Sequence, residues 1–114
     1  LQSAKQIGEF KFLGAQIGDG IGVDDLRTMA LDIKNRLGES VVALASISSE
    51  KPVIVVATSE LPRNKGIKAG ALAKIASGVL GGGGGGKDDF AQGGGVKTIE
   101  IPNALIAIEK ALSN

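Results

Sequence analysis

A run of six glycines, Gly81 to Gly86, limits the possible folds of this chain more than any other segment. Lys87 follows the run, and a second cluster closes it at Gly93 to Gly95. Glycine buries no side chain and loses the most backbone freedom on folding, so ordering the run costs about 2–6 kcal/mol more than ordering alanines. Packing a hydrophobic core gives no reason for it. Segment 81–95 is expected to be a disordered tether or a glycine-rich loop whose bare backbone closely approaches a ligand.

The composition predicts one globular domain over residues 1–114. A chain of 114 residues is long enough for one hydrophobic core and too short for two ordinary domains. Hydrophobic residues make up 43% and charged residues 22%, as in folded proteins. Cysteine and histidine are absent, which excludes disulfides, thiol or histidine-assisted catalysis and the usual structural zinc sites. We therefore expect no catalytic residue, metal or cofactor in this chain.

The location of the protein is predicted from what the chain lacks. No apolar stretch approaches the roughly 18–20 residues that cross a bilayer, and no signal segment opens the chain. We expect a soluble cytoplasmic protein with no membrane partner. The chain begins at Leu1 rather than at a methionine, which suggests a piece of a longer protein. A catalytic centre would then lie outside these residues.

The hydrophobic pattern of the first half predicts an α/β fold with a mixed sheet. A strand is expected over Ile7–Ile17, with its buried and exposed faces exchanged by a bulge at Gly14. Helical spacing follows over Asp24–Leu37. The β-branched segments Ser40–Ser48 and Val53–Thr58 read as a hairpin. Because a helix separates the first two strands, they should be parallel, and the third should be antiparallel to the second.

The second half is predicted to complete the domain with two helices and an edge strand. Leu61–Lys65 reads as a polar turn, and Ile67–Leu80 as a thin helix rich in alanine and glycine. The glycine-rich loop comes next. Val96–Ile101 alternates like a short edge strand, and Pro102 suits the first turn of a C-terminal helix.

Positive charge is concentrated around the glycine run. Leu61 to Lys97 holds six basic and two acidic residues, whereas Leu1 to Glu60 holds six basic and eight acidic ones. A phosphate-bearing partner would favour such a cluster. An ordinary solvated helix face carrying lysines would explain it equally well.

Nucleotide-binding motifs do not explain the glycines. A glycine homopolymer satisfies the dinucleotide fingerprint by default, and the chain has neither the preceding strand nor the ribose-binding acid of that motif. Gly81 and Gly86-Lys87 have phosphate-loop spacing, but Asp88 stands where a magnesium-binding hydroxyl is needed. The run also leaves the carboxyl end of the predicted helix, where the helix dipole repels phosphate.

The glycine segment is better suited to a nucleic acid. Unshielded main-chain amides and lysines fit a sugar-phosphate backbone, Phe90 offers a flat surface to a base, and Gln92 can donate and accept hydrogen bonds. Each has a structural alternative: Lys87 is simply solvated, Phe90 anchors the loop on the core, and Gln92 caps a turn. The candidate RNA-binding residues are Lys65, Lys68, Gly83, Gly84, Gly85, Gly86, Lys87, Phe90, Gln92, Gly93 and Gly94.

The segment KGIKAGALAKIASGVL followed by GGGGGGKDDFAQGGG strongly resembles the carboxyl-terminal domain of alanyl-tRNA synthetases. The resemblance is specific over about Lys65 to Gly95, and the upstream elements agree with the family's layout. Family members usually have Arg and Pro where this chain has Lys87 and Asp88. Lysine keeps the charge without the planar fork that binds phosphate bidentately. The matching positions are Ala69-Gly70, Gly81 to Gly86, Lys87, Asp89, Phe90, Ala91-Gln92 and Gly93 to Gly95.

The resemblance implies a tRNA-binding appendage of the ligase that joins alanine to its tRNA. Such a domain would hold the outer corner of the alanine-accepting tRNA and link aminoacylation to editing. ATP, magnesium and zinc would belong to the parent enzyme, and its catalytic and editing domains would be partners, with a homodimer in some members. Two alternatives remain open. One is an auxiliary nucleic-acid-binding domain of an Asp-His-His (DHH) phosphoesterase, and the other is a structural or dimerisation domain.

Overall fold

The computed structural model of the chain describes residues 4–113, so Leu1, on which the expectation of a longer parent rests, lies outside the described residues. Pairs of consecutive strands alternate with helices along this range, with one short 3₁₀ turn before the last helix. The elements are β1 (Lys5–Ile7), β2 (Phe10–Asp19), α1 (Val23–Leu37), β3 (Ser40–Ser48), β4 (Lys51–Thr58), α2 (Glu60–Asn64), α3 (Ala69–Leu80), β5 (Gly84–Gly86), β6 (Phe90–Gly94), the 3₁₀ turn (Thr98–Glu100) and α4 (Ile101–Leu112).

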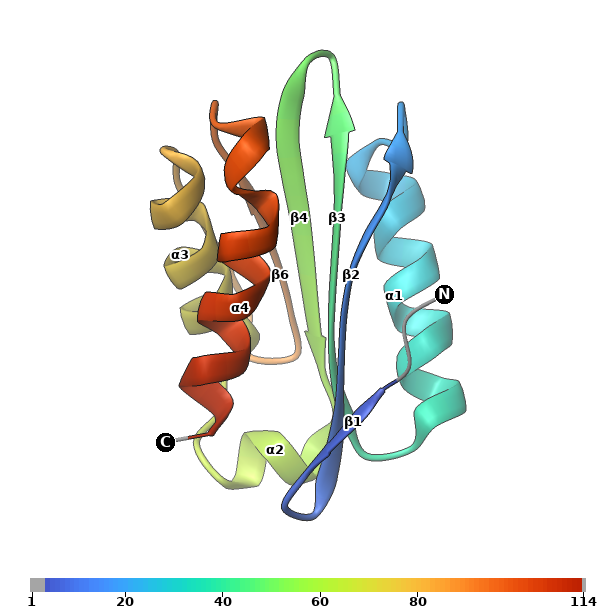
Figure 1. Cartoon of the computed structure of the whole chain (residues 1–114). Helices are drawn as coiled ribbons and strands as arrows, with labels where there is room; N and C mark the ends of the chain where they lie inside the picture. The colour runs from blue at the N-terminus through green and yellow to red at the C-terminus, as the bar shows by residue number, and fades with distance from the viewer. Residues whose placement is uncertain (1–3, 114) are drawn as a thin grey trace.

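All six strands form one mixed sheet in the order β1-β2-β3-β4-β6-β5. Helix α1 covers one face of the sheet, and α3 and α4 cover the other (Figure 1). β2 and β3 are parallel and joined through α1, while β3 and β4 form an antiparallel hairpin. The predicted α/β class, the crossover unit, the hairpin and the C-terminal helix are confirmed.

The central strands are buried on both faces. Val41 and Ala43 pack toward α3 and α4, whereas their neighbours Val42 and Leu44 pack toward α1. A strand covered on both faces needs apolar residues at every position, so its sequence reads as a continuous apolar run. This accounts for the density of Val, Ala and Ile in β3 and β4.

The prediction for the first strand is wrong in two respects. The segment from residue 7 to 17 is split between the short strand β1 and the long strand β2, which form an antiparallel hairpin. The faces also do not exchange at Gly14, because the pairing with β3 is continuous from Lys11 to Gln16 and becomes irregular only beyond that point. Phe12 faces the α4 side and Leu13 the α1 side. Both alternations are apolar because both faces of the sheet are covered.

Two predictions for the second half are also wrong. The polar turn at 61–65 is mostly the short helix α2. The expected edge strand over 96–101 is absent, because the amides of Val96 and Lys97 both donate to the carbonyl of Leu80 at 2.9 Å and so hold this backbone at the end of α3. Val96 is 62% and Ile99 85% exposed, and Ile101 is buried as the first residue of α4, so the alternation does not mark a strand.

The glycine segment 81–95 is not a loop. Gly84–Gly86 and Phe90–Gly94 pair as the antiparallel hairpin β5–β6, and β6 pairs with β4. β5 is therefore one of the two edge strands of the sheet, and β1 is the other. Glycine has a low strand propensity, so this conformation is imposed by the neighbouring elements.

A carboxylate fixes the junction between β4 and α2. Glu39 accepts hydrogen bonds from the Ser59 hydroxyl at 2.7 Å and from the Leu61 amide at 2.8 Å. These two bonds hold the pKa of Glu39 below its ordinary value of 4.5. A carboxylate whose pKa is lowered by folding stabilises the folded state when the pH is above its ordinary pKa. This contribution is lost as the pH falls through the lowered pKa.

We therefore expect Glu39→Gln to lower the melting temperature at pH 7 and to have little effect at pH 3. The amide of glutamine keeps one acceptor oxygen but loses the charge that strengthens both bonds. Thermal unfolding of both proteins between pH 3 and pH 7 would measure the difference. An equal difference in melting temperature at both ends of this range would contradict the assignment.

Candidate nucleic-acid interface

Helix α3 is attached to the glycine hairpin at its amino end. The amides of Ala69 and Gly70 donate to the carbonyls of Asp88 and Lys87 at 2.9 and 3.0 Å. The first amides of a helix are the groups that usually bind phosphate. Since carbonyls of the hairpin turn occupy these two, they are not free to bind an anion.

The carboxyl end of α3 is attached to the same hairpin. Gly81 adopts the left-handed conformation with φ 80°, and the amide of Gly82 donates to the carbonyl of Ser77 at 2.9 Å. The Leu80 carbonyl accepts hydrogen bonds from the amides of Val96 and Lys97, which follow β6. With both ends fixed, α3 lies directly against β5 and β6.

This close approach explains Gly70, Gly84, Gly93 and Gly95, whereas a Cβ on Gly82 or Gly86 would meet the facing segment 90–95. A Cβ atom on Gly84 would lie 2.5 Å from Oγ of Ser77 and 2.7 Å from Cα of Gly93, and a Cβ on Gly93 would also meet Ser77. A Cβ on Gly70 would lie 2.8 Å from the Gly86 carbonyl oxygen. The expectation that packing gives no reason for the glycines is therefore wrong, because α3 and the two hairpin strands lie too close together for side chains at these positions.

Two glycines of the run have no such close neighbour. Nothing lies within 4 Å of a Cβ built on Gly83, and a Cβ on Gly85 would meet only Cε of Lys74, at 3.7 Å. Gly85 also has a backbone φ of 159°, which residues other than glycine rarely adopt. The fold therefore leaves open space at Gly83 and beside Gly85.

The edge strand presents main-chain amides. The amide of Gly94 donates to the carbonyl of Gly83 at 3.3 Å, and the amide of Lys87 donates to the carbonyl of Phe90 at 3.0 Å. In an antiparallel ladder the hydrogen-bonded pairs alternate, so Gly85 bonds to its partner in β6. The amides of Gly84 and Gly86 then point away from β6, and the structure as described pairs them with no other strand.

A shallow hollow lies between the start of α1 and the hairpin. Its volume is about 410 Å³. The guanidinium carbon of Arg27 lies 4.9 Å from the centre of the Phe90 ring. Phe90 also packs against the core beneath α1, so the predicted anchoring role is part of what it does. The hollow is lined by Arg27, Gly85, Gly86, Lys87, Asp89, Phe90, Ala91 and Gln92.

The structure brings most of the predicted site residues together but separates one of them. Lys68 is exposed directly before α3, next to the hairpin turn. Lys65 instead forms an ion pair with Glu9 at 2.7 Å and lines a different hollow. Gly94 is placed by packing, since a Cβ there would lie 2.7 Å from the Pro52 carbonyl oxygen. The candidates that lie on the hairpin are Gly83, Gly84, Gly85, Gly86, Lys87, Phe90, Gln92, Gly93 and Gly94.

Two basic residues near the hairpin were not among the sequence candidates. Arg27 reaches it from α1, and nothing in the local pattern of that helix distinguishes it from a solvated residue. Lys74 passes beside Gly85 from α3. Lys74 is one of the basic residues that the sequence concentrates around the glycine run, which was the available signal. The proximity of Arg27 to the hairpin is apparent only in the tertiary structure, where α1 places it over Phe90 of β6.

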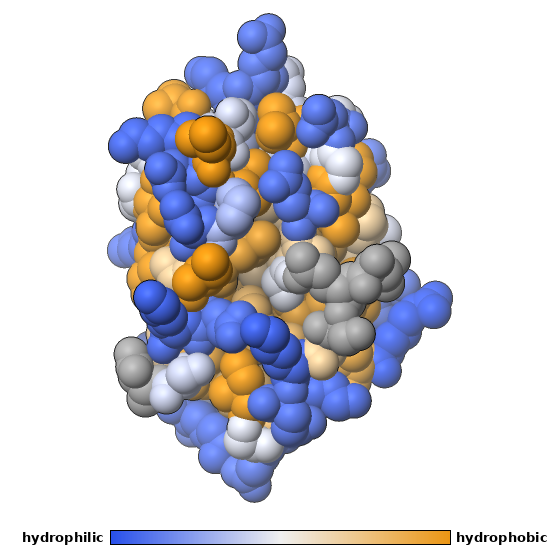
Figure 2. All heavy atoms as spheres, in the orientation of Figure 1, coloured by the Kyte–Doolittle hydropathy of each residue, from blue (hydrophilic) through white to orange (hydrophobic). Residues whose placement is uncertain are grey.

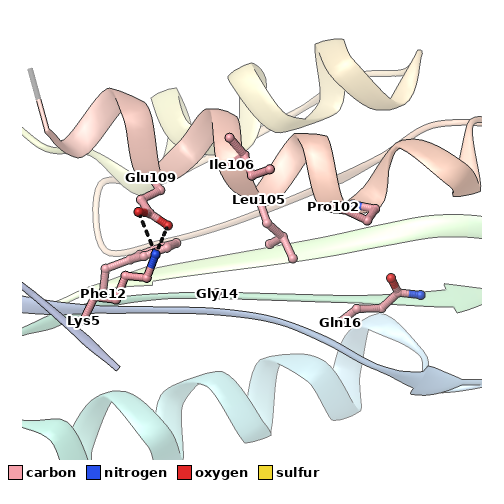
Figure 3. A pocket seen from close by; sticks show the side chains of 8 residues that line it. All are labelled: Lys5, Phe12, Gly14, Gln16, Pro102, Leu105, Ile106 and Glu109. Atoms are coloured by element: carbon pink, nitrogen blue, oxygen red, sulfur yellow. Dashed lines mark hydrogen bonds and ion pairs between the residues drawn. The ribbon is translucent and has the colours of Figure 1, made fainter. Parts of the chain in front are cut away.

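A second hollow lies on the other face of the sheet, between α4 and β2 (Figure 3). At one end Lys5 and Glu109 form an ion pair at 3.1 Å. Leu105 points from the helix toward the strands, and Ile106 is half exposed. None of the sequence candidates lies here. On the face of the molecule in Figure 2, hydrophobic and hydrophilic residues are interspersed.

The described part of the chain offers neither a metal centre nor a membrane span. Within residues 4–113, no three His, Cys, Asp or Glu side chains are grouped so as to hold a metal ion. The zinc and magnesium that the resemblance implies for a parent enzyme therefore do not fit the described residues. Each described helix is also too short or too polar to cross a bilayer.

Comparison with known proteins defines the class to which this fold and site belong. The model of the DHHA1 domain matches residues 9–114. The chain therefore belongs to the DHHA1 domain family. Its relatives within that family include alanine–tRNA ligases, which is the family predicted from the glycine motif. One from Renibacterium salmoninarum is 52% identical over 112 residues, and one from Leifsonia xyli subsp. xyli is 46% identical over 114 residues.

The alignments cover 96% and 98% of this chain but only 12% and 13% of these two enzymes. Among solved structures, the C-Ala domain of alanyl-tRNA synthetase from Aquifex aeolicus superposes with a TM-score of 0.88 at 28% identity, covering 99% of this chain and all of that one. A DHH-domain protein described as a member of a family of ribosomal proteins superposes with a TM-score of 0.63 at 15% identity, covering 98% of this chain and 28% of that one. This second likeness shows a shared fold alone.

Proposed function

We propose that this domain binds the alanine-accepting tRNA as the C-terminal part of an alanine–tRNA ligase. The observation that carries the proposal is the glycine edge strand β5, whose outward amides at Gly84 and Gly86 lie beside Lys74 and Lys87. Main-chain amides without neighbouring side chains admit a phosphate to hydrogen-bond distance, and lysines supply the positive charge. The similarity to alanine–tRNA ligases supports the identity of the RNA.

The role within the larger enzyme follows from the chemistry that this chain lacks. It has no histidine or cysteine, so it supplies none of the usual zinc ligands of these types and no histidine or thiol for ligation or editing. ATP, magnesium and zinc would then act in other domains of the ligase. The domain would hold the outer corner of the tRNA so that its acceptor end reaches both the aminoacylation and the editing centres, in the cytoplasm.

Amide exchange measured by NMR tests this proposal directly. We expect the amides of Gly84 and Gly86 to exchange rapidly in the free chain and at least tenfold more slowly with saturating tRNA, because phosphate oxygens accept their hydrogen bonds. The amide of Gly85 serves as an internal reference, since it is already bonded within the hairpin. Unchanged exchange at Gly84 and Gly86 in the complex would contradict the proposal.

A further inference from the structure

Arg27 and Phe90 form a cation–aromatic contact at the surface. Phe90 is held from below by the core beneath α1, and the guanidinium lies over the ring at 4.9 Å. Arg27 is exposed and forms no ion pair with any residue from 4 to 113. A cation over an aromatic ring contributes only about 0.5–1 kcal/mol at an exposed site. Stability alone therefore gives little reason for this pair.

The surroundings of the pair form an open shelf. Helix α1 packs on β3 and β4, and α3 packs on the opposite face of the hairpin. No described helix covers β5 and β6 on the Arg27 side. Gly85 contributes no side chain to the hollow, so a flat group can approach Gln92 and the outer face of the Arg27 guanidinium, which lies over Phe90. The volume of about 410 Å³ lies in the range of sites for small ligands, roughly 300–1,000 Å³.

We propose that this shelf binds an unstacked nucleobase, by stacking the base on the outer face of the Arg27 guanidinium, which Phe90 supports from below. The inference rests on the proposed RNA-binding function and names the group that the hollow recognises. Unpaired bases in RNA are commonly held on aromatic rings or on the plane of an arginine. Gln92 lies on the same side of β6 as Phe90 and can donate to and accept from the edge of the base.

The carboxylate of Asp89 in the hollow favours a nucleobase over a phosphate group as the ligand. Asp89 lines the same space as Arg27 and Lys87. A carboxylate repels a phosphate group placed beside it, but it accepts hydrogen bonds from the amino groups of bases. The hollow therefore suits a neutral flat ligand with donor groups, while the amides and lysines of the β5 edge suit the adjoining phosphate.

Competition with short RNAs separates base binding from charge. Labelled tRNA bound to the wild-type chain is displaced either by a pentaribonucleotide or by an abasic pentanucleotide with the same number of phosphates. We expect the pentaribonucleotide to compete at least about fivefold better, because one stacked base contributes about 1–3 kcal/mol and 1 kcal/mol corresponds to about a fivefold change in affinity. Equal competition, or none by either, would overturn the nucleobase site.

Substitutions locate the site on the shelf. We expect Arg27→Lys and Phe90→Leu each to weaken tRNA binding about five- to tenfold without changing its salt dependence, because Arg27→Lys keeps the charge and Phe90 carries none. Arg36→Lys is the matched control: it lies on the same helix, but its guanidinium is paired with Asp32 at 2.9 Å. Arg27 is exposed, so Arg27→Lys tests the site even if Phe90→Leu unfolds.

The outcomes separate this inference from the proposed function. If the wild-type chain binds tRNA and protects Gly84 and Gly86, but Arg27→Lys binds as tightly as Arg36→Lys, the nucleobase site is wrong and the RNA-binding function stands. If the wild-type chain does not bind tRNA, the proposed function fails, and the inference fails with it.

Discussion

Replacing Gly84 with alanine is expected to destabilise the domain by about 3 kcal/mol, because the added methyl group has no space. Its Cβ would lie 2.5 Å from Oγ of Ser77, 2.7 Å from Cα of Gly93 and 2.9 Å from the carbonyl oxygen of Gln92. Two of these three atoms are backbone atoms of β6, which is paired with β4 and cannot move aside freely. Denaturant unfolding of the variant and the wild type would measure the loss.

The neighbouring position provides the matched control. Nothing lies within 4 Å of a Cβ on Gly83, so Gly83→Ala should leave the stability unchanged or raise it by about 0.4–1 kcal/mol through the unfolded state. Similar losses for Gly83→Ala and Gly84→Ala would mean that the glycines serve chain flexibility rather than packing. The close approach of α3 would then not explain the run.

Ser77 allows the contact itself to be tested. Its hydroxyl is buried and has no hydrogen-bond partner among the described residues. Ser77→Ala removes this hydroxyl, so Gly84→Ala should cost at least about 0.5 kcal/mol less in the Ser77→Ala background. Strict additivity of the two substitutions would show that the added methyl group does not meet Ser77.

Lys87→Ala is expected to weaken tRNA binding about three- to tenfold in roughly 50 mM salt. The side chain is exposed in the turn between β5 and β6, and it follows the free amide of Gly86 directly. If it neutralises one phosphate, the slope of log affinity against log salt concentration should fall by about 0.7–0.9. Titrations between about 50 and 300 mM salt would give both values.

Lys51→Ala removes the same charge from a distant place. The amide of Thr58, at the end of β4, donates to the carbonyl of Asp89, so this end of β4 lies at the turn that carries Lys87. Lys51 is at the beginning of the same strand, roughly 23 Å from Thr58. Lys51→Ala should therefore leave the affinity and its salt slope almost unchanged. An equal loss for Lys51 and Lys87 would indicate a diffuse electrostatic effect rather than a site at the turn between β5 and β6.

Local patterns were sufficient for the elements whose partners are near in the sequence. The helix predicted over 24–37 is α1, because its apolar spacing and its terminal charges all agree. The hairpin of β3 and β4 needs only a two-residue turn, Ser49-Glu50, between β-branched segments. The first strand was misread because alternation has no meaning where both faces of a sheet are covered.

Most residues of the candidate site could be predicted from the sequence, but their arrangement in space could not. The glycine motif identified the family and placed Lys87, Phe90 and Gln92 on one segment, as the structure does. Lys65 was grouped with them by proximity in sequence, but it is turned toward Glu9 instead. Arg27 was missed because a helical arginine carries no local sign of the aromatic ring that it will meet.

The sequence alone determined the family, the α/β class and the positions of the long helices, because these depend on side-chain chemistry within a few neighbouring residues. Only the tertiary structure decided that the glycine run is a strand and that Arg27 reaches Phe90. A glycine has no side chain to express a preference, so its conformation is set by the neighbours that pair with it, β6 and α3. Two residues as far apart in sequence as 27 and 90 meet only because the sheet and α1 fix the distance between them.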